Sequence, residues 1–216
     1  ADIDAGLRTY MLRVYNYMAS ALALTGIVAL AASSSPAFMQ AVFGSGLSWI
    51  VMLAPFALVL VLSFGIHKMS MPAAQAVFWA YAALMGLSLS SIFLVYTGES
   101  IARTFFITAG TFGAMSLYGY TTKKDLAGWG SFLFMGLIGL IIASVVNIFL
   151  GSTMLQFVIS AAGVLIFTGL TAYDTQRIKE SYWEHDDATT AGKKAIFGAL
   201  QLYLDFINLF IMLLRF

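Results

Sequence analysis

Long apolar runs constrain the fold of this chain more than any other feature of its sequence. Seven segments of roughly 17–24 residues are long enough to cross about 30 Å of hydrocarbon at about 1.5 Å per residue. Their approximate limits are Val14–Ala32, Trp49–Ile66, Ala73–Tyr96, Ile101–Tyr120, Gly130–Leu150, Leu155–Tyr173 and Ala195–Leu214. Strands of a membrane barrel alternate apolar and polar residues, and these segments do not. The sequence therefore predicts an all-α integral membrane protein with seven transmembrane helices.

The composition agrees with this class and excludes several kinds of site. Of 216 residues, 61% are hydrophobic and 10% are charged, whereas soluble domains carry about 25% charged residues. The absence of cysteine excludes disulfides, thiolate metal sites and cysteine nucleophiles. A net charge of +1 gives no basis for binding nucleic acid. Because the spans use nearly the whole chain, we expect a single transmembrane domain over residues 1–216.

The connections and the basic residues predict how the chain crosses the membrane. The connections "SSSPAFMQAVFGSGLS", "HKMSMP", "TGES", "TTKKDLAGW" and "GSTM" are interpreted as short turns. The longest polar stretch is Gln176–Lys194. Lysine and arginine gather on the cytoplasmic side of membrane proteins. With the N-terminus in the cytoplasm, only Arg103 and Arg215 of the eleven basic residues lie outside. We expect that orientation, while the side of the C-terminus stays open.

The last apolar segment contains a carboxylate about midway along its length. A charge there costs roughly 2.5–3.5 kcal/mol on insertion scales, so an ionisable residue at that depth points to function. Gln201, Asp205 and Asn208 are spaced i, i+4, i+7 and therefore share one helix face. We expect this face to point into the bundle, where Gln201 and Asn208 either line a path or form interhelical hydrogen bonds.

A second carboxylate, Asp174, follows the sixth apolar segment, with Thr171 roughly on its face as a further candidate to line a path. Taken alone, Asp174 could be an interfacial charge at a helix end. Asp174 and Asp205 lie at equal distances in sequence from the middle of the segment that connects them, near Thr189 and Thr190. Antiparallel helices would therefore bring both residues to a similar depth if the sixth helix continues past Asp174.

Two carboxylates a few ångströms apart cannot both ionise cheaply, so they share a proton. Protonated once, the Asp174–Asp205 pair is a hydrogen-bonded link between two helices. Fully ionised, it repels itself and offers oxygen ligands to a cation such as calcium. Calcium takes about six to eight oxygens, so waters and backbone carbonyls would have to complete the shell. The pair is thus a candidate both for a switch and for a calcium site.

Other polar residues are weaker candidates. His67 and Lys68, at the end of the second span, could pair with the two carboxylates or could be snorkelling groups at the interface. Glu99 and Arg103 fit an ion pair at a helix end. The run Glu184–Asp187, "EHDD", is interpreted as solvated charge rather than a metal site. The pairs Gly86/Ser90 and Ala109/Gly113 have the spacing of close helix packing.

Four motifs closely resemble the Bax inhibitor-1 family over essentially the whole chain. They are "LRVYNYMASALALTG", "YGYTTKKDLAGWGSFLFMGL", "AYDTQRIK" and "LYLDFINLFIMLLRF". The resemblance implies six helices around a central seventh and a pH-sensitive calcium leak without a cofactor, in which calcium is the transported ion. It implies a bacterial cytoplasmic membrane. The family's di-aspartyl pH sensor falls on Asp174 and Asp205. The arginine that latches this sensor in bacterial relatives is replaced by His67, followed by Lys68, which puts the latch in doubt.

Two functions other than a calcium leak are alternatives for this sequence. A non-conducting regulator or scaffold would bind membrane proteases or death-pathway proteins, with Gln176–Lys194 as its surface. An intramembrane aspartyl protease also uses aspartates on adjacent helices. Its second aspartate follows Gly-x-Gly, however, whereas "LYL" precedes Asp205 here. We therefore expect no enzyme activity.

Overall fold

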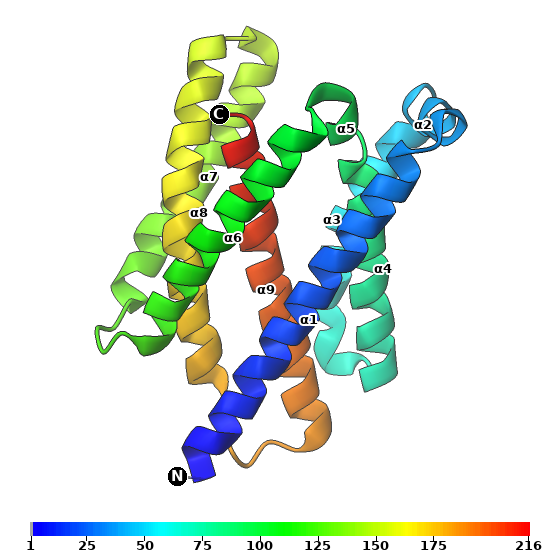
Figure 1. The fold of residues 1–216 in the computed structure, drawn as a ribbon. Coiled ribbons are helices and arrows are strands. Elements are labelled where there is room, and N and C mark those ends of the chain that lie inside the picture. Colours follow the sequence, from blue (N-terminus) through cyan, green and yellow to red (C-terminus); the bar gives the residue numbers. More distant parts are fainter. Residues whose placement is uncertain (1) are drawn as a thin grey trace. The chain divides into compact units, whose positions relative to one another are not determined.

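The structure is a computed structural model that describes residues 2–216, with side chains from residue 5 onward. Within this range all regular structure is helical and no strand occurs (Figure 1). The helices are α1 (Asp2–Ser33), α2 (Pro36–Phe43), α3 (Leu47–Gly65), the 3-10 turn η1 (Ile66–Lys68), α4 (Met71–Leu89), α5 (Ile92–Val95), α6 (Gly98–Thr121), α7 (Ala127–Leu150), α8 (Thr153–Ser181) and α9 (Ala188–Leu214). The prediction of an all-α membrane protein is confirmed.

Six stretches of this helical structure are long and apolar enough to cross a membrane: Ala5–Ser33, Leu47–Lys68, Met71–Val95, Ala127–Leu150, Thr153–Ser181 and Ala188–Leu214. The predicted span Ile101–Tyr120 also forms a helix, α6, but it carries buried polar side chains at Thr104, Thr108 and Ser116 and is not among the six. In the most apolar part of the α9 span, 61% is buried inside the protein, whereas the buried share in each of the other five spans is at most 28%. The arrangement of six helices around a seventh stays a prediction.

Two connections and one span differ from their sequence prediction. The segment interpreted as a turn after the first span contains α2, which Ser35 caps by accepting a hydrogen bond from the Phe38 N–H at 3.3 Å. Serine at the cap followed by proline is a helix-start pattern. The predicted span Ala73–Tyr96 is divided into α4 and α5. Most of Gln176–Lys194, predicted to be a polar connection, is helical, because α8 continues to Ser181 and α9 begins at Ala188.

The described chain divides into two compact units. The first comprises the chain up to Gly98 together with Tyr182–Tyr203, and the second comprises Glu99–Ser181 and Leu204–Phe216. Helix α9 therefore contributes its first part to one unit and its last part to the other. The single domain expected from the sequence stays a prediction.

In the first unit, α1 packs against α4, and α4 packs against α3. Helices α1 and α4 run parallel, because Gln75 donates a hydrogen bond to the Tyr17 hydroxyl at 2.9 Å and, further along both helices, Thr25 donates one to the Ala82 carbonyl at 2.8 Å. The Thr25 and Tyr203 hydroxyls are also hydrogen-bonded, at 2.6 Å. Thr25 therefore joins α1 to both α4 and the first part of α9.

Close approach of α1 and α4 requires glycine at position 86. A methyl group at Gly86 would lie 2.6 Å from the Thr25 carbonyl oxygen and 2.8 Å from Cβ of Val28. The small-residue spacing at Gly86 and Ser90 thus marks a real helix contact. The similar pair Ala109/Gly113 does not, because nothing lies within 4 Å of the corresponding position at Gly113.

In the second unit, α7 packs against α8. The turn between them is at Gly151, whose φ is positive, 61°. The core of this unit contains Leu140, Ile159, Phe167 and Leu209. Helix α6 joins it through Phe112, whose ring centroid is 5.5 Å from that of Phe206. The last part of α9 is therefore packed between side chains from α6, α7 and α8.

We expect Gly86→Ala to lower the thermal unfolding temperature of the detergent-solubilised protein. The added methyl group meets backbone, which cannot move as a side-chain end can, and overpacking of this kind costs about 1–3 kcal/mol. Gly113→Ala is the matched control and should be neutral or stabilising, because alanine is favoured over glycine in a helix. Equal unfolding temperatures for Gly86→Ala and the unsubstituted protein would contradict the α1–α4 packing.

Candidate di-aspartyl site

Asp205 lies inside the second unit, on α9, among residues of that helix that are mostly apolar. Its side chain is 5% exposed, and its neighbours Phe206 and Leu209 are buried as well. Aliphatic and aromatic residues on both sides give the continuous helix that carries the carboxyl group to this depth. The sequence prediction that Asp205 faces the protein interior agrees with this burial.

Asp174 reaches the same level because α8 does not end where its apolar run ends. The helix continues for seven residues beyond Asp174, to Ser181. Contacts between α8 and α9 show an antiparallel register, with Gly163 beside Met212 and Phe167 in the same cluster as Leu209. Continuing this register brings Asp174 within one turn of Asp205. The Asp174 side chain is half-buried.

The carboxyl groups of Asp174 and Asp205 lie within hydrogen-bonding reach of each other. A hydrogen bond between two carboxyl groups requires a proton on one of them, because an ionised carboxylate only accepts. Oδ2 of Asp205 is buried and has no hydrogen-bond partner among the described protein atoms. The positively charged Arg177, one turn further along α8, interacts electrostatically with Asp174.

Hydroxyl groups near the pair are engaged with backbone or with each other. The buried Thr171 donates to the Phe167 carbonyl at 2.8 Å, and Thr175 donates to the Thr171 carbonyl at 2.7 Å. The Thr175 and Ser116 hydroxyls are 2.9 Å apart, which links α8 to α6. A role for Thr171 in lining a path stays a prediction, and its proton is already committed to the helix backbone.

The two amides predicted on the Asp205 face have separate surroundings. Asn208 is half-buried and donates to the Leu204 carbonyl of its own helix at 2.8 Å. This hydrogen bond of Asn208 is within its own helix, whereas the sequence analysis also considered a hydrogen bond to another helix. Gln201 is half-buried and belongs to the first unit. A role for either amide in lining a path stays a prediction.

His67 and Lys68, the candidate latch, lie in η1 of the first unit, and both side chains are exposed. The His67 carbonyl accepts a hydrogen bond from Nζ of Lys193 at 3.3 Å. Asp174 and Asp205 belong to the second unit. The latch therefore stays a prediction.

Gln176 is a positioning residue that the sequence analysis missed. Its amide accepts from the Leu126 N–H and donates to the Lys124 carbonyl, both at 2.8 Å. It thereby fixes the connection between α6 and α7 against α8, two residues after Asp174. The interpretation of Gln176 as the start of a polar loop concealed this role. Its position directly after an apolar run, before the chain becomes polar, could have indicated that Gln176 still belongs to the helix.

The acidic run before α9 is partly structural rather than wholly solvated. Asp186 is paired with Lys194 at 2.6 Å, and its side chain is only 9% exposed. Asp187 caps α9 by accepting from the Thr190 N–H at 2.7 Å. No group of three or more acidic or histidine side chains among the described residues is placed to hold a metal ion. The exposed Glu99–Arg103 ion pair forms as predicted, at 2.8 Å.

Spans of this length and hydrophobicity, with a carboxyl pair carried by two of them, define an integral, multi-pass, all-α membrane protein. The family described as "Inhibitor of apoptosis-promoting Bax1" matches residues 7–216. The chain belongs to this family, the Bax inhibitor-1 family, as the sequence motifs indicated.

Bacterial relatives cover nearly the whole chain. "Inner membrane protein YbhL" of Escherichia coli K12 is 53% identical over 214 residues, which is 98% of this chain and 92% of YbhL. "Uncharacterized protein RP147" of Rickettsia prowazekii is 52% identical over 213 residues, covering 99% and 90% of the two chains. An uncharacterized protein of Caulobacter vibrioides is 50% identical over 225 residues, covering 100% and 90%.

We expect the cap of α9 to be lost only under acidic conditions. The Thr190 hydroxyl and backbone N–H hold the pKa of Asp187 below its usual range. A lowered folded-state pKa means that the cap stabilises the helix above the ordinary aspartate pKa of about 3.9 and is lost as the pH falls through the lower folded value. Hydrogen-exchange protection of the Thr190 amide should follow this course.

Asp187→Ala should remove that protection at neutral pH, whereas Asp187→Asn should keep most of it, because asparagine also accepts at a helix cap. The amide of Leu202, in the middle of α9, serves as the internal control. Unchanged protection of Thr190 in Asp187→Ala would contradict the cap.

Proposed function

We propose that this protein is a pH-sensitive calcium leak of the membrane, controlled by Asp174 and Asp205. The observation that carries the proposal is that two carboxyl groups on the membrane-spanning helices α8 and α9 lie within hydrogen-bonding reach of each other. Membership of the Bax inhibitor-1 family supports it. An ionisable group inside a membrane span costs energy, and two such groups in contact are best explained by a function that uses their proton.

Exchange of that proton changes the force between two helices. With one proton, the pair holds α8 and α9 together through a hydrogen bond. Without it, two like charges in a poorly solvated site repel each other. Whichever protonation state conducts, the conformation in this region follows the pH.

Calcium enters this proposal as the transported ion. Two carboxylates offer at most about four oxygens, whereas calcium takes about six to eight. A passing ion would keep several waters and hold the pair only weakly. Weak coordination suits transport, because an ion that is to leave must not be bound tightly. His67 and Lys68 stay candidates for a latch, and Gln201, Asn208 and Thr171 for the lining of the path.

The proposed location is a bacterial cytoplasmic membrane with the N-terminus in the cytoplasm. The name of the Escherichia coli relative, an inner membrane protein, supports the membrane. The bias of lysine and arginine supports the orientation. Reaction of single cysteines introduced near Arg8 with an impermeant thiol reagent, in intact cells, would check the side of the N-terminus.

We expect calcium flux into proteoliposomes to depend on pH for the unsubstituted protein and to lose that dependence in both Asp174→Asn and Asp205→Asn. Asparagine keeps the shape and the hydrogen-bonding capacity of the site but cannot gain or lose the proton. Asp125→Asn is the matched control, because Asp125 is an exposed carboxylate of the second unit. Its amide oxygen can still accept the bond from the Ala127 N–H.

Two outcomes would contradict the proposal. Unchanged rate and pH profile in both Asn variants would remove the carboxyl pair from gating. Absence of any flux from the correctly folded protein would favour a non-conducting regulator, which capture of membrane-protein partners would then support. Cleavage of helical peptides in detergent, abolished by either Asn variant, would instead indicate an intramembrane protease.

A further inference from the structure

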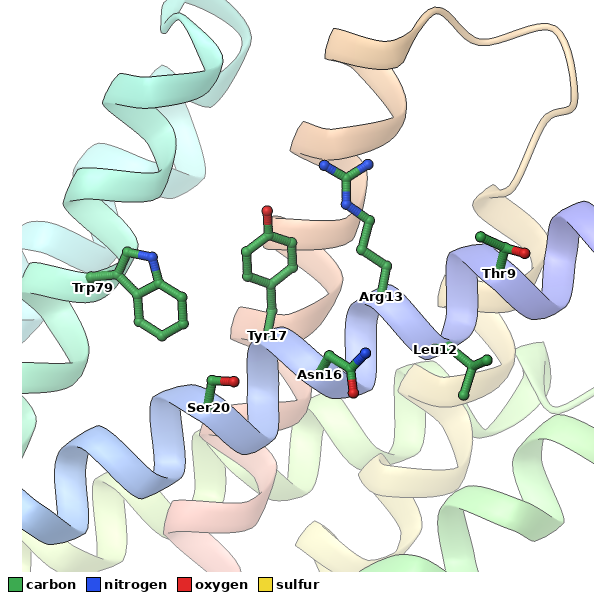
Figure 2. A pocket seen from close by; sticks show the side chains of 7 residues that line it. All are labelled: Thr9, Leu12, Arg13, Asn16, Tyr17, Ser20 and Trp79. Carbon is green, nitrogen blue, oxygen red and sulfur yellow. The ribbon is translucent and has the colours of Figure 1, made fainter.

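A groove with a volume of about 500 Å³ lies on the first unit, along α1 and beside α4. Figure 2 shows its lining: Arg13, Asn16, Tyr17 and Ser20 extend from successive turns of α1, and Trp79 extends from α4. The proposed calcium leak uses none of these residues. Arg13, Asn16 and Ser20 are all exposed, so a polar stripe lies on the outer face of a membrane helix.

The outer end of the groove, at Arg13, lies toward the N-terminal end of the α1 span, which we place among the lipid headgroups. The span containing α1 is 29 residues long, or about 43 Å at 1.5 Å per residue, which exceeds the hydrocarbon thickness of about 30 Å. Its ends therefore project into the headgroup layers. Arg13 lies level with the start of α4, because a methyl group at Gly192 would lie 2.7 Å from Cε of Met71 and 3.2 Å from Nη2 of Arg13.

Trp79 lies deeper in the same groove. It is eight residues beyond Met71 on a helix parallel to α1, or about 12 Å further along the axis. Tryptophan is favoured where headgroups meet hydrocarbon. Tyr17 lies between the two levels, with its hydroxyl hydrogen-bonded to Gln75 and its ring centroid 6.1 Å from that of Trp79. The groove is thus cationic at its outer end and aromatic at its inner end.

Within the described part of the chain, nothing neutralises the positive charge of the Arg13 guanidinium. Among the described side chains, no carboxylate lies within ion-pair distance of Arg13. Its described partner is the ring of Tyr17, whose centroid is 5.9 Å from Cζ. A guanidinium pairs with a phosphate through two parallel hydrogen bonds, and such a pair is strong where water is scarce.

We propose that this groove binds an anionic phospholipid from the leaflet on the N-terminal side of α1. The phosphate pairs with the Arg13 guanidinium. The Asn16 amide and the Ser20 hydroxyl face the glycerol and ester region, and an acyl chain lies against Trp79. The order of these groups along the groove, charged, then polar, then aromatic, is the order of groups along a phospholipid from headgroup to chain.

The test uses fluorescence quenching of Trp79 by lipids with brominated acyl chains. The full chain, with Trp49, Trp129 and Trp183 replaced by phenylalanine, is reconstituted in phosphatidylcholine vesicles. Brominated phosphatidylglycerol or brominated phosphatidylcholine is then titrated in. We expect phosphatidylglycerol to reach half-maximal quenching at a mole fraction about fivefold lower, the preference that one cation confers near an anionic surface.

Arg13→Gln should remove this preference, whereas Arg8→Gln should keep it. Arg8 is the matched control, because it is an exposed arginine of the same helix that does not line the groove. Native mass spectrometry of the chain with all four tryptophans should show phosphatidylglycerol retained over phosphatidylcholine, with the same response to the two substitutions.

Several results would overturn the proposal. Equal quenching by the two lipids with Arg13 in place would show that the groove does not select an anionic lipid, and this comparison needs no arginine variant. Equal loss of preference in Arg8→Gln and Arg13→Gln would indicate general surface charge. Loss of the preference on addition of millimolar inorganic phosphate would indicate a site for soluble anions.

Discussion

A hydrogen bond between two carboxyl groups inside a membrane protein is a demanding interaction, because it exists only while the pair keeps a proton. In this chain the two partners are Asp174 of α8 and Asp205 of α9, which lie within hydrogen-bonding reach of each other. Much of the second unit serves to make the contact possible. Helix α8 extends beyond its apolar run, and Gln176 fixes the neighbouring connection against it. Lys179 donates to the Tyr120 carbonyl at 2.8 Å and ties the end of α8 to α6.

Close packing and hydrogen bonds between neutral groups stabilise the first unit in a different way. In the first unit, Gly86 lets α1 and α4 come into direct contact. The Thr25 hydroxyl is hydrogen-bonded to both the Ala82 carbonyl and the Tyr203 hydroxyl. These contacts contain no ionisable group near its transition at neutral pH, so they should be insensitive to pH. Any pH response of helix packing is therefore expected at Asp174 and Asp205 rather than at the contact between α1 and α4.

Part of the structure follows from the sequence, and the reasons are physical. Apolar runs longer than the membrane is thick leave few alternatives to helices, so the class and the approximate spans could be predicted. Equal spacing of Asp174 and Asp205 about their connection predicted that they would come level, since an antiparallel helix pair has a fixed rise per residue. A pair of charged residues four positions apart on one helix says much less about which helices meet. The Glu99–Arg103 pair, which is exposed, is an example.

Other features could not be predicted because they depend on packing between distant segments. Spacing alone gave the same expectation for Gly86 and Gly113, and only the contact with α1 distinguishes them. Asp186 looked solvated in a polar run, but Lys194 reaches it from the next helix. The groove beside α1 could not be predicted, because Arg13 and Trp79 are far apart in the chain and neither residue alone indicates a groove.

The central claim is that Asp174 and Asp205 share one proton. Infrared difference spectroscopy between acidic and alkaline pH observes the carbonyl stretch of a protonated carboxyl group directly. A shared proton predicts one band from a buried carboxylic acid whose frequency and titration midpoint change in Asp174→Asn and also in Asp205→Asn, because either substitution removes the sharing partner. A band that persists unchanged in either variant, or two bands lost independently, would contradict it.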